Sequence, residues 1–282
     1  MLAKTQTPAD LSINPRDMAF RPATPAARWW LGGDPIATAF FNALSASFPQ
    51  GERFFMDAVR PYRDEAEPQL RSQIVAFTTQ EAIHSREHLA FNNSLAAHGY
   101  DLTRIDAYLK GRFDFGRKLP KLNQLCATIA LEHFTAILAH AILSDKDDLA
   151  DAQPELQHMW QWHAMEEIEH KAVAFDTFLS ATRNFSALRR WWARCFSMVL
   201  TSIMFLQFLR FGVREFFRQD GIDNRQSWRA LRHYLWTKPG LFRRVAPSYF
   251  AYFKPGFHPW HVDDRELIAG VEAALTPNYA KA

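Results

Sequence analysis

Apolar residues recur every three or four positions along most of the 282-residue chain, a spacing typical of helices that bury one face. Glycine is scarce, and the clusters of Gly, Asn and Asp that mark hairpin turns are few. Helix breaks are expected at Phe48-Pro49-Gln50-Gly51, at Gly99 and before Pro154. The pattern therefore predicts an all-α fold. The predicted helices cover 35–47, a new helix from 52, about 67–98, 119–144, about 154–181 and about 186–218.

Two of these helices carry the motif Glu-x-x-His, and a single glutamate in apolar surroundings precedes each motif by 29 or 35 residues. Residues three apart lie on one helix face, so a carboxylate and an imidazole can reach the same metal ion. Four-helix proteins that hold two irons use one Glu from each of two helices and Glu-x-x-His from each of the other two. Four carboxylates and two imidazoles suit iron or manganese. The predicted ligands are Glu52, Glu81, His84, Glu132, Glu167 and His170.

A seventh candidate ligand is His163, which precedes Glu167 by four residues and His170 by seven. At about 100° per residue these three side chains fall within an arc of about 60°. His163 is therefore either a third imidazole ligand or a buried histidine that supports one. A third Glu-x-x-His, Glu155 to His158, points to the opposite side of the same helix and is expected to face solvent.

Supporting residues can be predicted from position, because metal-bound histidines usually donate their other ring N–H to a nearby acceptor. Glu166 is expected to orient His84, and Gln80 is expected to orient His170. His88 shares the face of the first motif but lies two turns further on, so a supporting or channel role is expected, with a plain core histidine as the alternative. The other charged residues of the motifs are expected to face solvent: Glu87 and Glu169.

The formal net charge of +3 is unevenly distributed. Residues 1–182 hold 17 basic and 23 acidic residues (−6), residues 183–254 hold 14 and 3 (+11), and the last 28 hold 2 and 4 (−2). Such asymmetry indicates a surface partner for the basic part. No nucleic-acid-binding motif accompanies it, so no nucleic-acid partner is expected. Peripheral membrane contact through 188–254 is the alternative that the aromatic and basic composition suggests.

The stretch 188–218 has an apolar centre, from Cys195 to Leu209, flanked by arginine and tryptophan. Its 15 residues are too few to span a bilayer. Two interpretations remain open: a buried fifth helix whose arginine ends reach water, which is favoured, and an interfacial element on anionic lipid.

Several classes of protein are excluded or disfavoured. Two cysteines, Cys126 and Cys195, cannot form a disulfide framework, so a reducing compartment is expected. The N-terminal stretch has no apolar signal region, and no run of 18 uncharged apolar residues occurs. The expected location is cytoplasmic, with peripheral attachment at the inner face of the membrane. Nucleophile-elbow, phosphate-loop and dinucleotide-binding glycine motifs are missing, which excludes serine hydrolases, NTPases and dinucleotide enzymes.

The order of ligands resembles that of ferritin-like di-iron proteins, and the additional His163 resembles the arylamine N-oxygenase branch, which uses a third histidine. Over residues 25–262 the chain resembles a bacterial family labelled "predicted metal-dependent hydrolase". The stretches that carry this resemblance are Phe48–Phe55, Gln80–His88, His163–His170 and Tyr252–Trp260.

The resemblance implies a ferritin-like four-helix bundle with additional C-terminal helices. Residues 1–30 would be an N-terminal extension, 31–182 the dimetal bundle, and 183–282 a basic, aromatic-rich helical extension packed on it. A carboxylate-rich centre of this kind can activate O₂, which favours a di-iron oxidase or oxygenase. Glu81 and Glu167 would bridge the two iron ions, or manganese ions, while Glu52 and Glu132 would be terminal ligands.

The expected partners of this oxygenase are O₂, an apolar or aromatic small molecule, an unidentified electron donor and, in a homodimer, a second copy of the chain. Two other functions stay open. The same ligands could lower the pKa of a metal-bound water for a dimetal-dependent hydrolase. A ferritin-like iron-binding or sensor protein would need no catalysis, and a storage cage would elute very large in size-exclusion chromatography.

Overall fold

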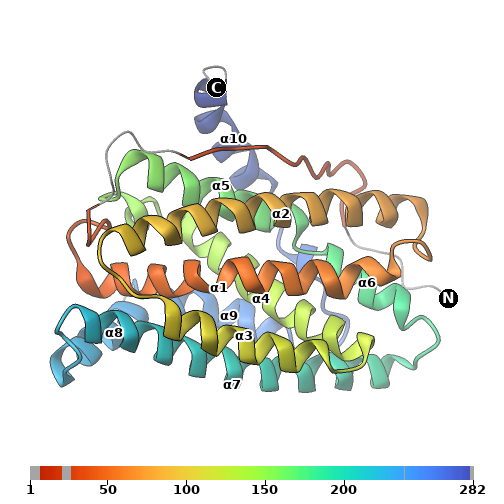
Figure 1. Cartoon of the computed structure of the whole chain (residues 1–282). Coiled ribbons are helices and arrows are strands. Elements are labelled where there is room, and N and C mark those ends of the chain that lie inside the picture. Colours follow the sequence, from red (N-terminus) through yellow and green to blue (C-terminus); the bar gives the residue numbers. More distant parts are fainter. Residues whose placement is uncertain (1–6, 21–26, 238, 280–282) are drawn as a thin grey trace.

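A computed structural model describes residues 7–20, 27–237 and 239–279, and over these residues the protein is all-α, as predicted (Figure 1). The helices are α1 Pro35–Val59, α2 Pro68–Ala97, α3 Thr103–Arg117, α4 Lys121–Ser144, α5 Pro154–His170, α6 Val173–Ala181, α7 Ala187–Gln219, α8 Arg225–Trp236, α9 Leu241–Ala251 and α10 Arg265–Tyr279.

Four helices surround the centre of the molecule. Helix α1 packs along α2 and α4 packs along α5, while contacts of α1 with α4 and of α2 with α5 close the group. Helix α7 lies against α1 and α4, α3 lies beside α1 and α7, and α9 packs on α4 (Figure 1). Every predicted metal ligand comes from α1, α2, α4 or α5. The ferritin-like topology and the division into segments at 30 and 182 remain predictions.

The predicted break at Phe48–Gly51 is wrong, because α1 continues through Pro49. A proline inside a helix has no N–H to donate to the carbonyl four residues earlier, here that of Ser45. The Nδ2 of Asn92 on α2 donates to this carbonyl at 3.1 Å instead. Helix α1 therefore stays continuous because a neighbouring helix supplies the hydrogen bond that the proline removes.

The predicted helix 154–181 is two helices, since α5 ends at His170 and α6 begins at Val173. Lys171, in the turn between them, is buried and forms an ion pair with Asp264. Its Nζ donates to the carbonyl of Val262 at 2.8 Å and lies 4.0 Å from the ring centroid of Trp260. Residues that follow α9 thus fix Lys171 in the turn between α5 and α6. The apolar spacing of 154–181 does not predict this turn. The pattern also does not predict α3, in which only Ile105 and Leu109 are buried.

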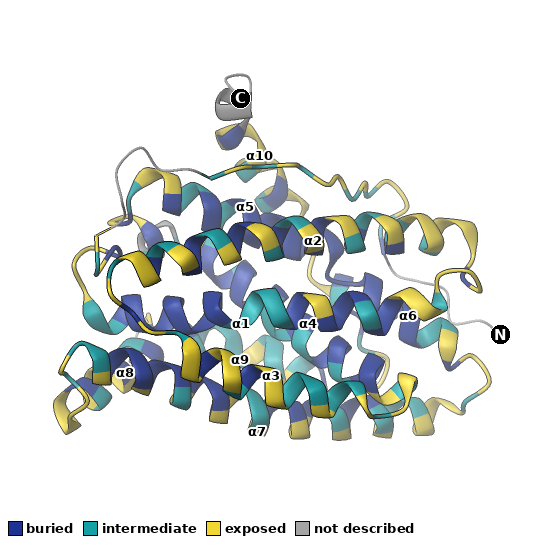
Figure 2. Ribbon diagram, viewed as in Figure 1, coloured by how far each residue is buried: buried dark blue, intermediate teal, exposed yellow. Residues whose placement is uncertain are grey.

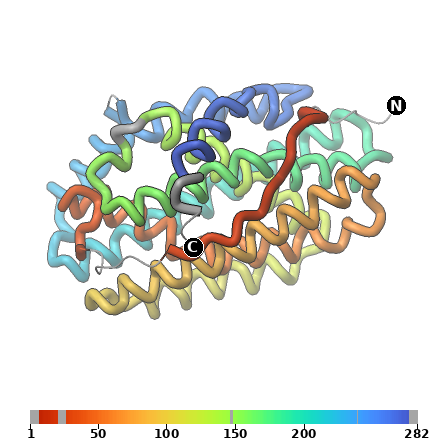
Figure 3. Tube along the Cα trace, turned by 90° about the horizontal axis from the view of Figure 1, so that it is seen from above, coloured from red at the N-terminus to blue at the C-terminus, as the bar shows by residue number. Residues whose placement is uncertain are grey.

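The segment 7–20 is packed on the bundle. Seen from above, it runs between α2 and the C-terminal α10 (Figure 3). The Oγ1 of Thr7 donates to Asp176 at 2.8 Å, and the backbone N–H of Phe20 donates to Glu87 at 2.8 Å. The partners in these two hydrogen bonds are 169 and 67 residues apart in sequence. The segment therefore connects α6 with α2.

Helix α7 is half buried, so the favoured interpretation of a buried fifth helix is only partly right. Among the described residues, α4 and α7 are by length and composition apolar enough to cross a membrane; 72% of the apolar window of α4 is buried, against 33% of that of α7. The inner face of α7 packs on α1 closely enough that a Cβ on Gly212 would lie 3.1 Å from that of Ala43. Its outer face is exposed (Figure 2).

We expect Asn92→Ala to lower the free energy of unfolding by about 1–3 kcal/mol, because it leaves the buried carbonyl of Ser45 without a donor. Asn93→Ala, on the exposed face of the same helix, should change it by less than about 0.5 kcal/mol. Urea unfolding followed by circular dichroism measures both. In a Pro49→Ala background the effect of Asn92→Ala should shrink, because the helix then supplies its own donor. Equal losses for Asn92 and Asn93 would contradict this account.

Candidate metal centre

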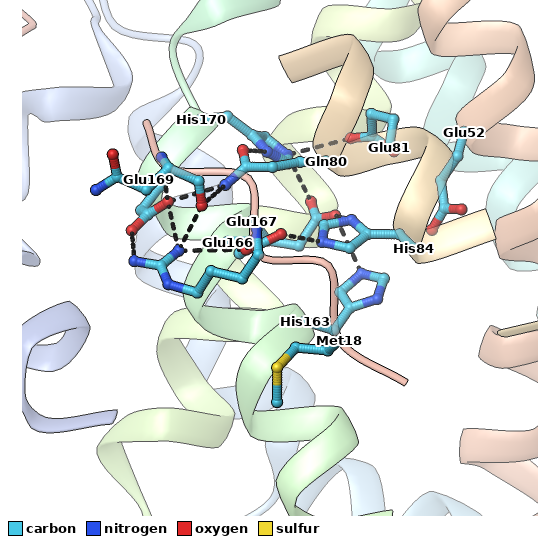
Figure 4. A network of polar contacts seen from close by, with 12 residues as sticks. Met18, Glu52, Gln80, Glu81, His84, His163, Glu166, Glu167, Glu169 and His170 are labelled. Atoms are coloured by element: carbon cyan, nitrogen blue, oxygen red, sulfur yellow. Dashed lines mark hydrogen bonds and ion pairs between the residues drawn. The ribbon is translucent and has the colours of Figure 1, made fainter. Parts of the chain in front are cut away.

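The seven predicted ligands converge in the middle of the bundle, and none is more than 3% exposed. Their ligand atoms form two groups, within each of which all atoms lie within 4.8 Å of one another. Figure 4 shows that the side chains from α2 and α5 point toward one another, with Glu52 of α1 beside them. The first group is Glu52, His84 and His163, and the second is Glu81, Glu132, Glu167 and His170.

The donor atoms of these residues fit metal ions better than they fit one another. On each of the seven, at least one buried oxygen or nitrogen has no hydrogen-bond partner. Several nevertheless lie close together: the Nε2 of His170 is 3.2 Å from Glu81, 3.6 Å from Glu132 and 3.5 Å from Glu167. Ligands about 2.0–2.2 Å from a common ion stand about 3.0–3.5 Å apart. Atoms at this spacing that satisfy no hydrogen bond could hold a metal ion in each group.

Two histidines of the centre present one ring nitrogen inward and bind a supporting side chain with the other. The Nε2 of His84 is hydrogen-bonded to Glu166 at 3.0 Å, and its Nδ1 has no partner. The Nδ1 of His170 donates to the Oε1 of Gln80 at 3.0 Å, and its Nε2 has no partner. These are the pairings that the sequence predicts for Glu166 and Gln80, and such contacts orient a metal-bound imidazole.

His163 is oriented by a longer chain of hydrogen bonds. Its Nδ1 lies 2.7 Å from the Nε2 of His88, whose Nδ1 lies 2.8 Å from the Oγ of Ser45. Ser45 donates to the Oδ1 of Asn92 at 2.8 Å, so it accepts from His88 Nδ1–H. His88 then accepts from His163, and the Nε2 of His163 faces the centre with a free lone pair. Burial lowers the pKa of His163 to about 4, which keeps the ring neutral. These contacts place His88 directly behind His163, and its supporting role remains a prediction.

Glu167 lies between the two groups. Its Oε1 is 3.0 Å from the Nε2 of His163 and 3.5 Å from the Nδ1 of His84, and its Oε2 is 3.5 Å from His170. One oxygen facing each group is the arrangement of a bridging carboxylate. The Oε1 of Glu81 lies 3.2 Å from the Nε2 of His170.

The four glutamates of the centre carry more negative charge than its histidines can balance. Burial, followed by the charge of Glu81, raises the pKa of Glu52 and of Glu132 well above the usual range. Burial also acts to raise the pKa of Glu167, but the charge of His170 and hydrogen bonds from the histidines lower it well below that range. The glutamates thus differ strongly in proton affinity, and divalent cations would stabilise all of them as carboxylates.

Glu169 is buried and does not face solvent, contrary to the prediction. It accepts from the Nε2 of Gln80 at 2.9 Å and from the Nη2 of Arg16 at 2.7 Å. Arg16 also lies 3.2 Å from Glu166, so it holds the two carboxylates that support His84 and, through Gln80, His170. Burial opposes the charge of Arg16, yet the hydrogen bond to Glu169 and the nearby carboxylates raise its pKa.

Sequence reasoning missed Arg16, Ser45 and Ser85, the last of which donates to Glu52 at 2.8 Å. The acidic residues beside the second motif, Glu166 and Glu169, indicate that a cation lies nearby. The sequence pattern does not identify that cation as Arg16. Glu87 is likewise buried, contrary to the prediction, because Arg86 and the backbone of Phe20 bind its two oxygens.

The third Glu-x-x-His lies outside the centre, since Glu155 is exposed and His158 is half-buried.

A largely apolar cavity of about 390 Å³ reaches the centre at His163 and Glu167. Its walls come from α1, α3, α4, α5 and α7 and are mostly leucine, phenylalanine and alanine. A cavity of this size is in the range of small-molecule sites.

Removing one imidazole should empty one position only. We expect His163→Ala to bind about one metal ion per chain where the unaltered protein binds two, because the first group loses a donor. His158→Ala is the matched control from the same helix and should keep both. Elemental analysis of protein dialysed against dilute chelator measures the content. Two ions bound to His163→Ala would exclude His163 as a ligand.

Arg16→Met should weaken metal binding by about 10–100-fold, because Glu166 and Glu169 lose the cation that fixes their position. Arg63→Met removes an arginine whose partner Asp64 is 81% exposed, so it should leave affinity unchanged. Competition with a chromophoric chelator gives both affinities. Equal affinities in the two variants would show that Arg16 does not support the centre.

No curated protein and no solved structure matches the chain significantly. A family model described as "Predicted metal-dependent hydrolase" does match, over residues 14–263. This span covers most of the chain and includes every ligand described above. The chain therefore belongs to the family of predicted metal-dependent hydrolases.

Proposed function

We propose that this protein is a non-haem di-iron oxidase or oxygenase that acts on an apolar small molecule. The observation that carries the proposal is the apolar cavity that ends at His163 and Glu167 of a buried, carboxylate-rich centre. Two irons held there would supply O₂ activation: one oxygen atom would enter a C–H bond of the substrate, and the other would leave as water with two electrons from an external donor and two protons from solvent.

The surroundings of the centre favour oxidation over hydrolysis. A hydrolase has to admit water and a polar ester, amide or phosphate, whereas this cavity is lined mostly by hydrocarbon side chains such as Phe54, Leu131 and Phe205. Such walls suit O₂ and an apolar substrate, and they exclude the water that would intercept a reactive centre.

The chain's own residues have separable roles in this proposal. Glu167 would bridge the two positions, and Glu81 beside His170 would be the second bridge. Glu52 and Glu132 would be terminal ligands. The hydrogen bonds of Glu166, Gln80 and His88 hold the imidazoles in the tautomers that leave a lone pair facing inward.

A dimetal-dependent hydrolase is the second candidate, and the family description favours it. In that reading the same ligands would hold redox-inactive ions and lower the pKa of a bound water. Iron binding without catalysis, in a sensor or a ferritin-like store, is a third reading. We also propose a cytoplasmic location with peripheral attachment to the membrane.

One experiment distinguishes the oxygenase from the hydrolase. Protein loaded anaerobically with Fe²⁺ should hold two irons per chain and, after chemical reduction, take up O₂. Glu167→Ala should reduce uptake by about 10²-fold or more, because it removes a proposed bridging ligand, and Glu155→Gln should not. An oxygen electrode measures uptake. Ester hydrolysis that needs only Zn²⁺ or Mn²⁺, without O₂ uptake, would establish the hydrolase instead.

Iron binding without turnover is tested on the same sample. Two irons without O₂ uptake or hydrolysis, in a particle that elutes as a large cage, would indicate storage.

A further inference from the structure

The outer face of α7 carries a continuous apolar stripe. At about 100° per residue the exposed members fall within an arc of about 120°, and they extend for about 27 Å along the axis. Large apolar side chains gathered in this way mark an interaction surface. Each exposes between 49% and 69% of its surface: Leu188, Trp192, Phe196, Val199, Leu200, Ile203 and Leu206.

The stripe is continuous with the cavity of the metal centre. Phe196 and Leu200 belong to both, and Phe115 on α3, 60% exposed, also lines the cavity. At its inner end the same cavity touches His163 and Glu167. An apolar molecule that passes between α3 and α7 therefore meets mostly hydrocarbon between the surface and the centre.

Arginines bound the stripe at both ends. Arg189 precedes it and Arg210 and Arg214 follow it, all exposed and all within the same arc. Arg214 is also paired with Asp223 at 3.0 Å. The acidic residue of α7, Glu215, is buried and lies 3.2 Å from Arg104 and 3.0 Å from Arg218. An apolar face with arginine ends complements an anionic membrane surface.

A second copy of the chain fits this face less well. Antiparallel pairing of two α7 helices across a twofold axis would place Arg189 of one copy near Arg210 and Arg214 of the other. Like charges facing each other oppose association, and although Asp223 pairs with Arg214 at 3.0 Å, α7 has no exposed acid to offset Arg189 and Arg210.

A cationic group lies among the cavity walls. Arg112 of α3, one turn before Phe115, donates to the Oη of Tyr108 at 3.0 Å and to the Oε1 of Gln207 at 3.0 Å. Both acceptors are neutral, so the guanidinium retains its charge for an anion at the entrance.

We propose that α7 rests on an anionic membrane and that the cavity takes up a long-chain fatty acid from it. The carboxylate would bind Arg112 and the hydrocarbon tail would point toward His163 and Glu167. The inner face of α7 packs on α1 and α4, so the helix lies along the surface and does not cross it. This inference rests on the proposed function, because it names the substrate class of the same centre.

Membrane contact is tested by flotation with phosphatidylcholine vesicles that contain or lack phosphatidylglycerol. The unaltered protein should float with anionic vesicles, and Ile203→Glu should lose about tenfold or more in binding. Leu89→Glu on α2 is the matched control, since Leu89 and Ile203 expose 53% and 51%. Equal flotation of the two variants would overturn the proposal. So would a lipid-free dimer that Ile203→Glu dissociates, because the stripe would then belong to a second copy.

Fatty-acid binding is tested with palmitate by native mass spectrometry of metal-loaded protein. Ala127→Trp, which fills the cavity, should weaken palmitate binding about tenfold or more. Arg112→Leu should weaken binding of palmitate but not of 1-hexadecanol, which lacks the charge. Unchanged palmitate binding in both variants would overturn the proposal. Palmitate binding without O₂ uptake would refute only the proposed function, and O₂ uptake without palmitate binding would refute only this inference.

Discussion

Glu52, Glu81, Glu132 and Glu167 come from four helices and are each at most 3% exposed, so their mutual repulsion has to be offset inside the protein. A buried charge without a partner is strongly destabilising. Burial acts to lower the pKa of His84 and of His170, but the neighbouring carboxylates raise both, so these two histidines offset part of the charge. Arg16 offsets that of the two carboxylates behind them. The remaining excess is what two divalent ions would balance, and the unpartnered donor atoms lie where such ions would bind. The four-helix arrangement, the supporting shell and the N-terminal segment all follow from this requirement.

The orientation of His163 on α5 is linked to Pro49 on α1 by a series of hydrogen bonds. Because Pro49 donates no N–H, the carbonyl of Ser45 takes one from Asn92. This contact directs the Oδ1 of Asn92 toward Ser45, whose hydroxyl donates to it. The Oγ of Ser45 then accepts from the Nδ1–H of His88. A backbone irregularity in α1 is thus connected, through side chains alone, to the protonation of an imidazole on α5.

The fold class and the residues gathered at the centre could be predicted from sequence because both depend on local spacing. Glu81 and His84 share a face whatever surrounds their helix. The continuity of α1 could not be predicted, because Asn92 stabilises it from another helix. Nor could the burial of Glu169, whose partner Arg16 lies 153 residues away. The solvent exposure of the outer face of α7 could not be predicted either. An apolar pattern shows which helix face is hydrophobic but not whether another element covers it.

The position of Arg16 also bears on how the centre is assembled. Arg16 is synthesised about 150 residues before Glu166 and Glu169, and it also lies 2.9 Å from Glu272 of α10. The N-terminal segment can dock only after α5 has emerged and folded. Because α5 supplies three of the seven candidate ligands, the ligands come together before Arg16 can bind the carboxylates behind them.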